Sequence, residues 1–224
     1  MIDPAVRNFD KVWTRFLSRL GMYSPTAVST LRPGATAEQI AHLEAVLGFA
    51  LHPDVGALLE RHNGTEYAEY GGSAEGADFL PSGYMLDSID QILAGHQQRM
   101  DLSAQTRALG SSEDDDLYAH AYQWVPIAHS ISAAILLVEH RPGPSYGHVI
   151  SLGIGSGDFE GTKWADTPLE FFDALTDSLN TRRPFHDETP GVRESDSTGE
   201  ILMYWEQPAG DLPEDPFPRA WYFE

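Results

Sequence analysis

The stretch Thr36–Gly64, TAEQIAHLEAVLGFALHPDVGALLERHNG, decides the fold class of the N-terminal half of the chain. Thr36 and Gln39 have the spacing of a capping box, in which two side chains satisfy the first N–H groups of a helix. Gly48 suits the left-handed position that ends a helix. Four apolar residues at helical spacing between these signals predict one buried face: Ile40, Leu43, Val46 and Leu47.

The second half of the same stretch predicts another helix. Pro53 fits the first helical position, where its missing N–H costs no hydrogen bond. The sequence Asn63-Gly64 then ends the helix, because glycine accepts the backbone angles of a tight turn. Three apolar residues give this helix its buried face: Val55, Leu58 and Leu59. The stretch is therefore a predicted helix pair.

Further along the chain, one more helix is expected before the pattern changes. Asp87 or Ser88 can cap a helix that runs to about residue 105. Three β-rich runs then follow, at Trp124–Ile127, Ala133–Val138 and His148–Leu152. A last helix starts at the cap Thr167 and reaches Leu179. Helices, then strands, then a closing helix predict an α+β domain whose mainly antiparallel sheet has helices packed on one face.

The N-terminal segment 1–22 reads as an amphipathic helix. Its apolar residues recur at three- and four-residue spacing: Val6, Phe9, Trp13, Phe16, Leu17 and Leu20. Such a helix can dock on a membrane or a partner. Alternatively, it packs on the acidic body of its own chain, and the sequence favours this second interpretation.

The chain divides into three predicted parts. The amphipathic helix spans 1–22, the α+β domain spans 23–184, and residues 185–224 form an acidic, Pro-rich extension. This extension contains one apolar island, Ile201–Trp205, which we expect to add an edge strand.

The charge of the chain excludes several classes of partner. The formal net charge is −20, and residues 1–32 carry +3 of it, which leaves −23 on the other 192 residues. Such a surface repels phosphate backbones, so nucleic-acid binding is not expected. No cluster of Lys and Arg is present to bind an anionic membrane. A basic protein is the partner that this charge favours.

Few residues in the chain suggest catalysis, and we predict no catalytic residue, no metal and no cofactor. The absence of Cys excludes disulfides, thiol nucleophiles and Cys-ligated zinc. The nine His lack the spacing of metal ligands, so surface or cap positions fit them better. The glycines at 153, 155 and 157 precede Asp158 and Glu160, which favours a loop between elements over a phosphate site.

Two acidic segments are the predicted partner-binding sites. The run Glu113–Asp116 fits a solvated loop or a docking site for a basic protein, and calcium binding fits it less well because a calcium loop spaces its ligands. The Gly-rich segment 65–79 is the second. The eight predicted contact residues are Glu66, Glu69, Glu75, Asp78, Glu113, Asp114, Asp115 and Asp116.

The order of these features resembles the SUKH superfamily, which includes the yeast Smi/Knr cell-wall regulator and many bacterial immunity proteins. The likeness covers roughly residues 25–180. Six residues carry it and read as scaffold: Glu44, Gly48, Pro53, Gly64, Trp124 and Pro126. Members often have a Gly and an Asp around the central strand pair, where this chain has Ser132 or Ala133 and Glu139.

The resemblance implies a binding protein and not an enzyme. In bacteria it implies an immunity protein that neutralises a cognate secreted toxin domain, such as a basic nuclease. The alternative is a regulatory or scaffolding module like the yeast member. No signal peptide or membrane span is evident in the sequence, so a cytoplasmic location is expected. The sequence leaves the oligomeric state open.

Overall fold

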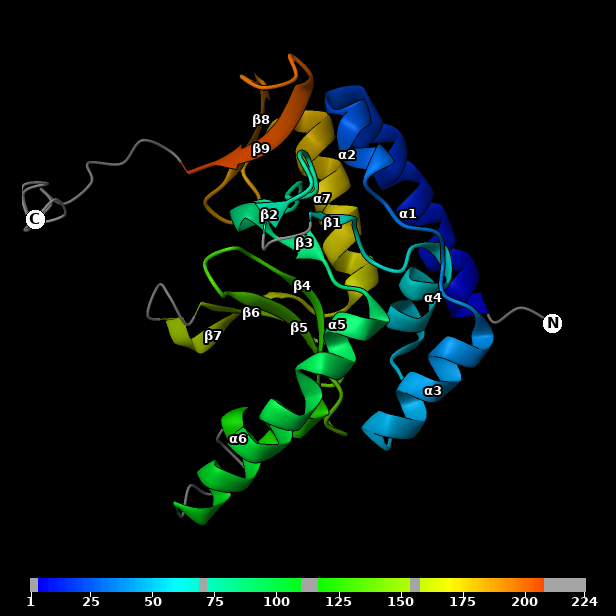
Figure 1. Ribbon diagram of the computed structural model, residues 1–224, viewed down its shortest axis with the longest axis vertical. Helices are drawn as coiled ribbons and strands as arrows, with labels where there is room; N and C mark the ends of the chain where they lie inside the picture. The colour runs from blue at the N-terminus through cyan, green and yellow to red at the C-terminus, as the bar shows by residue number, and fades with distance from the viewer. Residues whose placement is uncertain (1–3, 69–71, 110–116, 154–157, 208–224) are drawn as a thin grey trace, which may run out of the picture.

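The computed structural model describes residues 4–68, 72–109, 117–153 and 158–207, and it contains helices and strands in mixed order (Figure 1). The helices are α1 (Pro4–Tyr23), α2 (Pro25–Ser29), α3 (Ala37–Leu47), α4 (Pro53–Arg61), α5 (Ile89–Ala94), α6 (His96–Ala108) and α7 (Pro168–Thr181), with short 3-10 segments η1 (Pro81–Gly83) and η2 (Leu117–Gln123). The strands are β1 (Tyr67–Ala68), β2 (Gly72–Ser73), β3 (Met85–Leu86), β4 (Trp124–His129), β5 (Ile135–Glu139), β6 (Val149–Gly153), β7 (Asp158–Ala165), β8 (Thr189–Glu194) and β9 (Ile201–Glu206).

The main sheet is antiparallel throughout and has the strand order β3-β4-β5-β6-β7. This confirms the predicted α+β class, and β4, β5 and β6 fall on the three predicted β-rich runs. Strand β7 was not predicted. It pairs with β6 through two register shifts, and its sequence DFEGTKWA lacks the apolar alternation of a regular strand.

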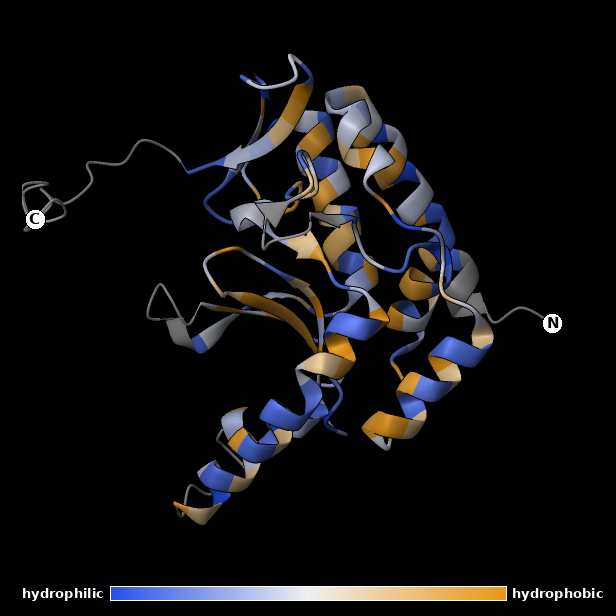
Figure 2. Cartoon of the chain, viewed as in Figure 1, coloured by the Kyte–Doolittle hydropathy of each residue, from blue (hydrophilic) through white to orange (hydrophobic). Residues whose placement is uncertain are grey.

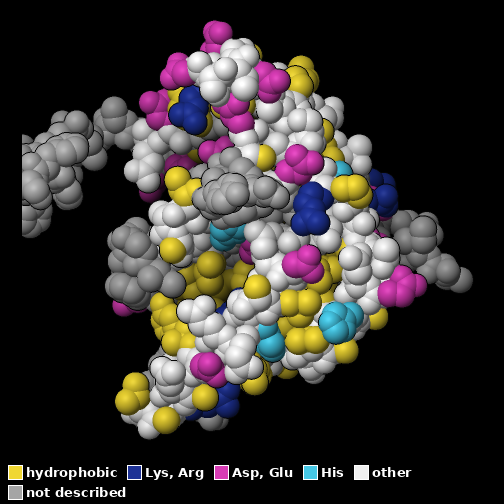
Figure 3. Space-filling view, in the orientation of Figure 1, with side chains coloured by type: hydrophobic (Ala, Val, Ile, Leu, Met, Phe, Trp, Pro, Cys, Tyr) yellow, Lys and Arg dark blue, Asp and Glu magenta, His cyan; other side chains and the backbone are white. Residues whose placement is uncertain are grey.

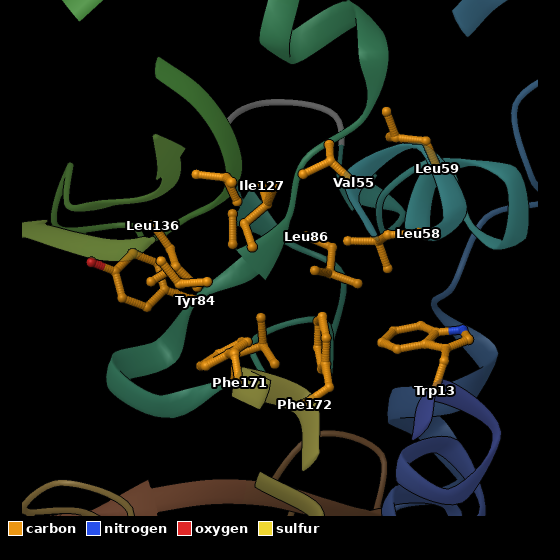
Figure 4. Packing of buried hydrophobic residues seen from close by; sticks show 14 of the residues in the cluster. Trp13, Val55, Leu58, Leu59, Tyr84, Leu86, Ile127, Leu136, Phe171 and Phe172 are labelled. Atoms are coloured by element: carbon orange, nitrogen blue, oxygen red, sulfur yellow. The ribbon is translucent and has the colours of Figure 1, made fainter. Parts of the chain in front are cut away.

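One face of the sheet holds the main hydrophobic core, which is covered by α7, α1 and α4. Phe172 of α7 lies between the sheet and Trp13 of α1 (Figure 4). The Phe172 ring is 4.8 Å from that of Trp13 and 5.3 Å from that of Phe16. Leu136 and Val138 of β5 point into the same cluster. In the predicted apolar stripe of α1, four residues are fully or almost fully buried, which are Phe9, Trp13, Phe16 and Leu20. The N-terminal helix thus packs on its own chain.

The other face of the sheet carries a smaller cluster. Its buried members are Ala121, Trp124, Leu137 and Leu152. Helix α6 and η2 cover part of this face, and α6 extends away from the rest of the molecule (Figure 1). Colouring by hydropathy shows α6 as largely hydrophilic, whereas β5 and β6 beside it are hydrophobic (Figure 2).

The caps of α3 and α4 follow the sequence signals. Thr36 and Gln39 form a complete capping box, and Gly48 ends α3 at a φ of 81°. The predicted face of α3 is correct for Leu43 and Leu47, but Val46 is 44% exposed. The single helix predicted from residue 88 to about 105 is wrong, because α5 and α6 meet at Gly95 as two helices.

The C-terminal extension forms its own sheet. Strand β9 pairs with β8 along six residues, from Thr189 opposite Glu206 to Glu194 opposite Ile201. The island Ile201–Trp205 is therefore a strand, but not an edge strand of the main sheet. The Trp205 indole donates to the Phe79 carbonyl at 2.8 Å, which ties this hairpin to the domain. None of the described helices has the length and apolar character needed to cross a membrane.

Candidate functional site

The eight acids predicted to contact a partner differ in how well they can be placed. Five of them lie outside the described residues: Glu69, Glu113, Asp114, Asp115 and Asp116. Of the other three, Glu66 is exposed and Asp78 is half-buried. The backbone N–H of Glu66 donates to the Thr30 carbonyl at 2.7 Å. The preceding residue, Thr65, forms an isolated antiparallel β-bridge with Leu31.

The third described acid, Glu75, already has partners within the chain. Its carboxylate accepts hydrogen bonds from the hydroxyls of Ser195, of Ser197 at 3.1 Å and of Thr198 at 3.0 Å. The bond from Ser195 is the main cause of a lowered pKa, so Glu75 stays ionised. Glu75 therefore anchors the segment before Ala77 to the turn between β8 and β9, and it brings a negative charge there.

This turn carries further acids that the sequence analysis did not select. Glu194, Asp196 and Glu200 are exposed and belong to the β8–β9 hairpin, which also contributes Arg193. Figure 3 shows acidic side chains gathered over the hairpin at the top of the molecule. Together with Glu75, these three residues form what we call the hairpin acidic surface. Its signal in the sequence is the density of acids in residues 187–200.

The residues that carry the family likeness hold the helix pair together. The Glu44 carboxylate accepts from the Leu51 N–H at 2.8 Å and so links α3 to the segment before α4. Pro53 is the first residue of α4, whose N-cap is His52. Gly64 has a φ of 76°, and a side-chain carbon there would lie 2.6 Å from the Ser88 backbone nitrogen. Only glycine permits this close approach.

The central strands contain the rest of these positions. Trp124 begins β4 and is 1% exposed, and the buried Pro126 lies at a register shift between β4 and β5. Ala133, in the connection between β4 and β5, has a φ of 63°. This is the left-handed region that a side chain disfavours.

A cluster of titratable residues joins α4 to the hairpin of β5 and β6. His140 is 4% exposed, so the prediction that the His are surface or cap residues is wrong for it. Its Nδ1 donates to the Val138 carbonyl at 2.9 Å and its Nε2 accepts from the His52 N–H at 2.8 Å. Burial is the main cause that lowers the pKa of His140 to about 4. His140 is therefore a neutral structural link.

Asp54 extends this cluster to α7. It is buried, which raises its pKa, and its carboxylate accepts from the Leu169 N–H at 3.1 Å, in the first turn of α7. His52 and Asp54 belong to the sequence Leu51–Asp54 within the helix pair. Within the described residues, no three His, Asp or Glu side chains are grouped so that they could hold a metal ion. The arrangement connects helices and strands, and its hydrogen bonds are internal to the fold.

The sequence agrees with one known family over most of its length. Residues 34–174 match the sequence model described as the SMI1 / KNR4 family (SUKH-1). The match includes the helix pair, the main sheet and the first half of α7, and it ends before the β8–β9 hairpin. No curated protein matches the chain closely enough to be compared with it.

Proposed function

The chain belongs to the SMI1 / KNR4 family (SUKH-1), and from this membership we propose that it is a non-enzymatic immunity protein that binds and neutralises a cognate toxin domain. The family supports an immunity or Smi/Knr type of module and is generally non-catalytic. The proposed partner is a basic domain, such as a nuclease, which must itself attract phosphate groups.

The observation that supports a basic partner is the net charge of the chain, together with the position of its acids on the surface. The net charge is −20, and the hairpin acidic surface places Glu75, Glu194, Asp196 and Glu200 around one turn. Opposite charge speeds the encounter of two proteins, by about 10 to 1,000 fold at low salt. A fast encounter suits an inhibitor that has to occupy its target before the target acts.

A charge-reversal experiment tests the proposal. We propose as the partner a basic toxin domain encoded next to this gene, and the experiment measures the rate at which that domain associates with the chain. We expect the triple variant Glu194→Lys, Asp196→Lys and Glu200→Lys to slow association by about tenfold or more at low salt, and by less at high salt.

The matched control reverses three exposed acids of α3, α4 and α5, which are Glu38, Glu60 and Asp90. It changes the net charge by the same amount, so a slower rate specific to the hairpin variant supports the hairpin as the docking surface. Equal rates for both variants would remove the hairpin from the proposal. Failure of the wild-type chain to protect cells from the toxin would reject the immunity function itself.

The second candidate is a regulatory or scaffolding module, and the match to the model named after the Smi and Knr regulators favours it. A stable complex with a protein of the same cell, in the absence of any toxin gene nearby, would support this alternative. The salt dependence of that complex then reports whether the same acids take part.

A further inference from the structure

A cleft of about 630 Å³ lies on the second face of the sheet, between α6 and strands β4 to β6. Its apolar lining includes Leu102 of α6 and Ile135 and Leu152 of the sheet. Figure 3 shows a hollow with hydrophobic side chains in this part of the molecule, beside α6. The volume lies in the range of roughly 300–1,000 Å³ that is typical of small-ligand pockets.

Arg99 of α6 lines this cleft and has few partners for its positive charge. Its Nη2 donates to the Ile92 carbonyl at 2.6 Å, whereas its buried Nε has no acceptor among the described residues. It forms no ion pair with any described carboxylate. Burial lowers the pKa of Arg99 to about 10, so it is still protonated at neutral pH.

Charged groups of both signs surround Arg99, and each of the others already has a hydrogen-bond partner within the chain. The Asp87 carboxylate interacts electrostatically with Arg99 and partly offsets the lowering of its pKa by burial. Asp87 already accepts a hydrogen bond from His129. That bond raises the pKa of His129, which also lines the cleft. Asp101 is exposed at the cleft and accepts from Gln97 at 2.9 Å. One half-buried Arg in a chain of net charge −20 favours a monoanion over a dianion such as phosphate.

Trp124 supplies a second group without a partner. It lines the cleft, it is 1% exposed, and its indole N–H has no acceptor among the described residues. An indole nitrogen only donates. Most buried donors in proteins are paired. The unpartnered nitrogens of Arg99 and Trp124 are both donors, and both lie beneath the wall of the cleft.

We propose that this cleft binds a carboxylate carried on an apolar body. The carboxylate accepts hydrogen bonds from Arg99, and the apolar part packs on Leu102, Ile135 and Leu152. A neutral apolar ligand would fill the same space but leave the Arg99 charge without a counter-ion, which is costly inside a protein. Such a ligand is either a free amphiphilic acid or the C-terminal carboxylate of an apolar peptide, since both present the same group.

The first experiment compares matched probes on the wild-type protein. Octanoate and octanamide are each titrated into the protein and their affinities are compared. A short apolar peptide with a free C-terminus is compared in the same way with the same peptide carrying an amidated C-terminus. Calorimetry gives the affinities, and the NMR signal of the Trp124 indole N–H reports the location. We expect each acid to bind about tenfold more tightly than its amide, because a charge-assisted hydrogen bond to Arg is lost in the amide.

These pairs separate the two sources of the ligand. Preference for octanoate alone identifies a free acid, and preference for the free peptide terminus alone identifies a peptide. Equal affinity for acid and amide in both pairs overturns the proposal, as does the absence of binding at about 1 mM, which corresponds to a free energy near −4 kcal/mol.

Variants of α6 residues then test whether Arg99 is the group that makes the cleft prefer an acid. Arg99→Met should abolish the preference for the acid, while Arg99→Lys should keep part of it. Arg107→Met is the matched control, because Arg107 lies on the same helix but donates to the Ala119 carbonyl at 3.1 Å and to Ser103 at 2.7 Å. Retained acid preference in a folded Arg99→Met protein contradicts the role of Arg99. If that variant does not fold, the wild-type comparison still decides.

Discussion

The two faces of the main sheet differ in how completely they are covered. On one face, α7, α1 and α4 bury a continuous set of aromatic and aliphatic residues, including Phe171 and Phe172 of α7. On the other face, among the described residues, α6 and η2 cover a small cluster around Trp124 and leave the cleft that Arg99 lines. The same strands contribute to both faces, because neighbouring residues of a strand point in opposite directions.

This difference suggests a division of tasks within one domain. The covered face excludes water and holds the strands in place, so changes there act on folding. The half-covered face has open space beside its buried side chains, so changes there are expected to act more on binding than on stability. Three measurements test this comparison.

The largest effect is expected for Phe172→Ala on the covered face. Its ring contacts those of Trp13, Phe16 and Phe171 at centroid distances of 4.8, 5.3 and 5.0 Å. Truncation leaves a cavity that rigid neighbours do not fill, so we expect a loss of about 4 kcal/mol in the free energy of unfolding, measured with urea. A loss below about 1.5 kcal/mol would mean that this face repacks easily.

The next effect concerns His140 at the junction of α4 with the sheet. Its pKa is about 4 in the folded protein and near 6.5 in the unfolded chain. The unfolded state therefore binds more protons between these values, and the stability that neutral His140 supports is complete above about pH 6.5 and is lost as the pH falls towards 4. The variant His140→Gln does not titrate, but its side-chain oxygen can still accept from the His52 N–H.

We expect the wild type to lose about 2–3 kcal/mol more stability than His140→Gln between about pH 7.5 and pH 4.5, because a shift of one pKa unit corresponds to about 1.4 kcal/mol. Urea unfolding at both pH values measures this difference. His52 also has a pKa lowered by burial, but it is present in both proteins and cancels in the comparison. Parallel pH profiles of the two proteins would show that His140 is not the group responsible.

The smallest of the three effects is expected for Leu152→Ala on the half-covered face. Leu152 is buried in the small cluster, yet it borders the cleft, so water and neighbouring side chains can fill the space it leaves. We expect a loss of about 2 kcal/mol, at the low end for such a truncation. If the loss equals that of Phe172→Ala, the two faces are equally rigid and the proposed division of tasks is wrong.

Local signals in the sequence predicted most of the fold. Thr36, Pro53 and Thr167 mark the starts of α3, α4 and α7, because capping and the fixed φ of proline act within a few residues. Strand β7 was missed because its pairing with β6 depends on bulges and on Gly161, whose φ is 75°. The break between α5 and α6 at Gly95 was missed because an isolated glycine is also tolerated within a helix.

The candidate sites depended more on tertiary structure. The acids of residues 66–78 were selected from composition, but only the fold places Glu75 against the turn of a hairpin that begins more than a hundred residues later. The cleft was not predicted, since Arg99 and Trp124 belong to different elements and neither has a distinctive motif. Burial of His140 was not predicted either, because its two hydrogen-bond partners lie on separate segments.

The position of α1 has a consequence for synthesis of the chain on the ribosome. Its aromatic residues Phe9, Trp13 and Phe16 pack against Phe172, yet roughly 145 residues separate the end of α1 from the start of α7. At about 5–20 residues per second, translation takes roughly 7–30 s to cover that distance. During this interval the nascent chain exposes the side of α1 that α7 later buries. We therefore expect ribosome-associated chaperones to bind this helix.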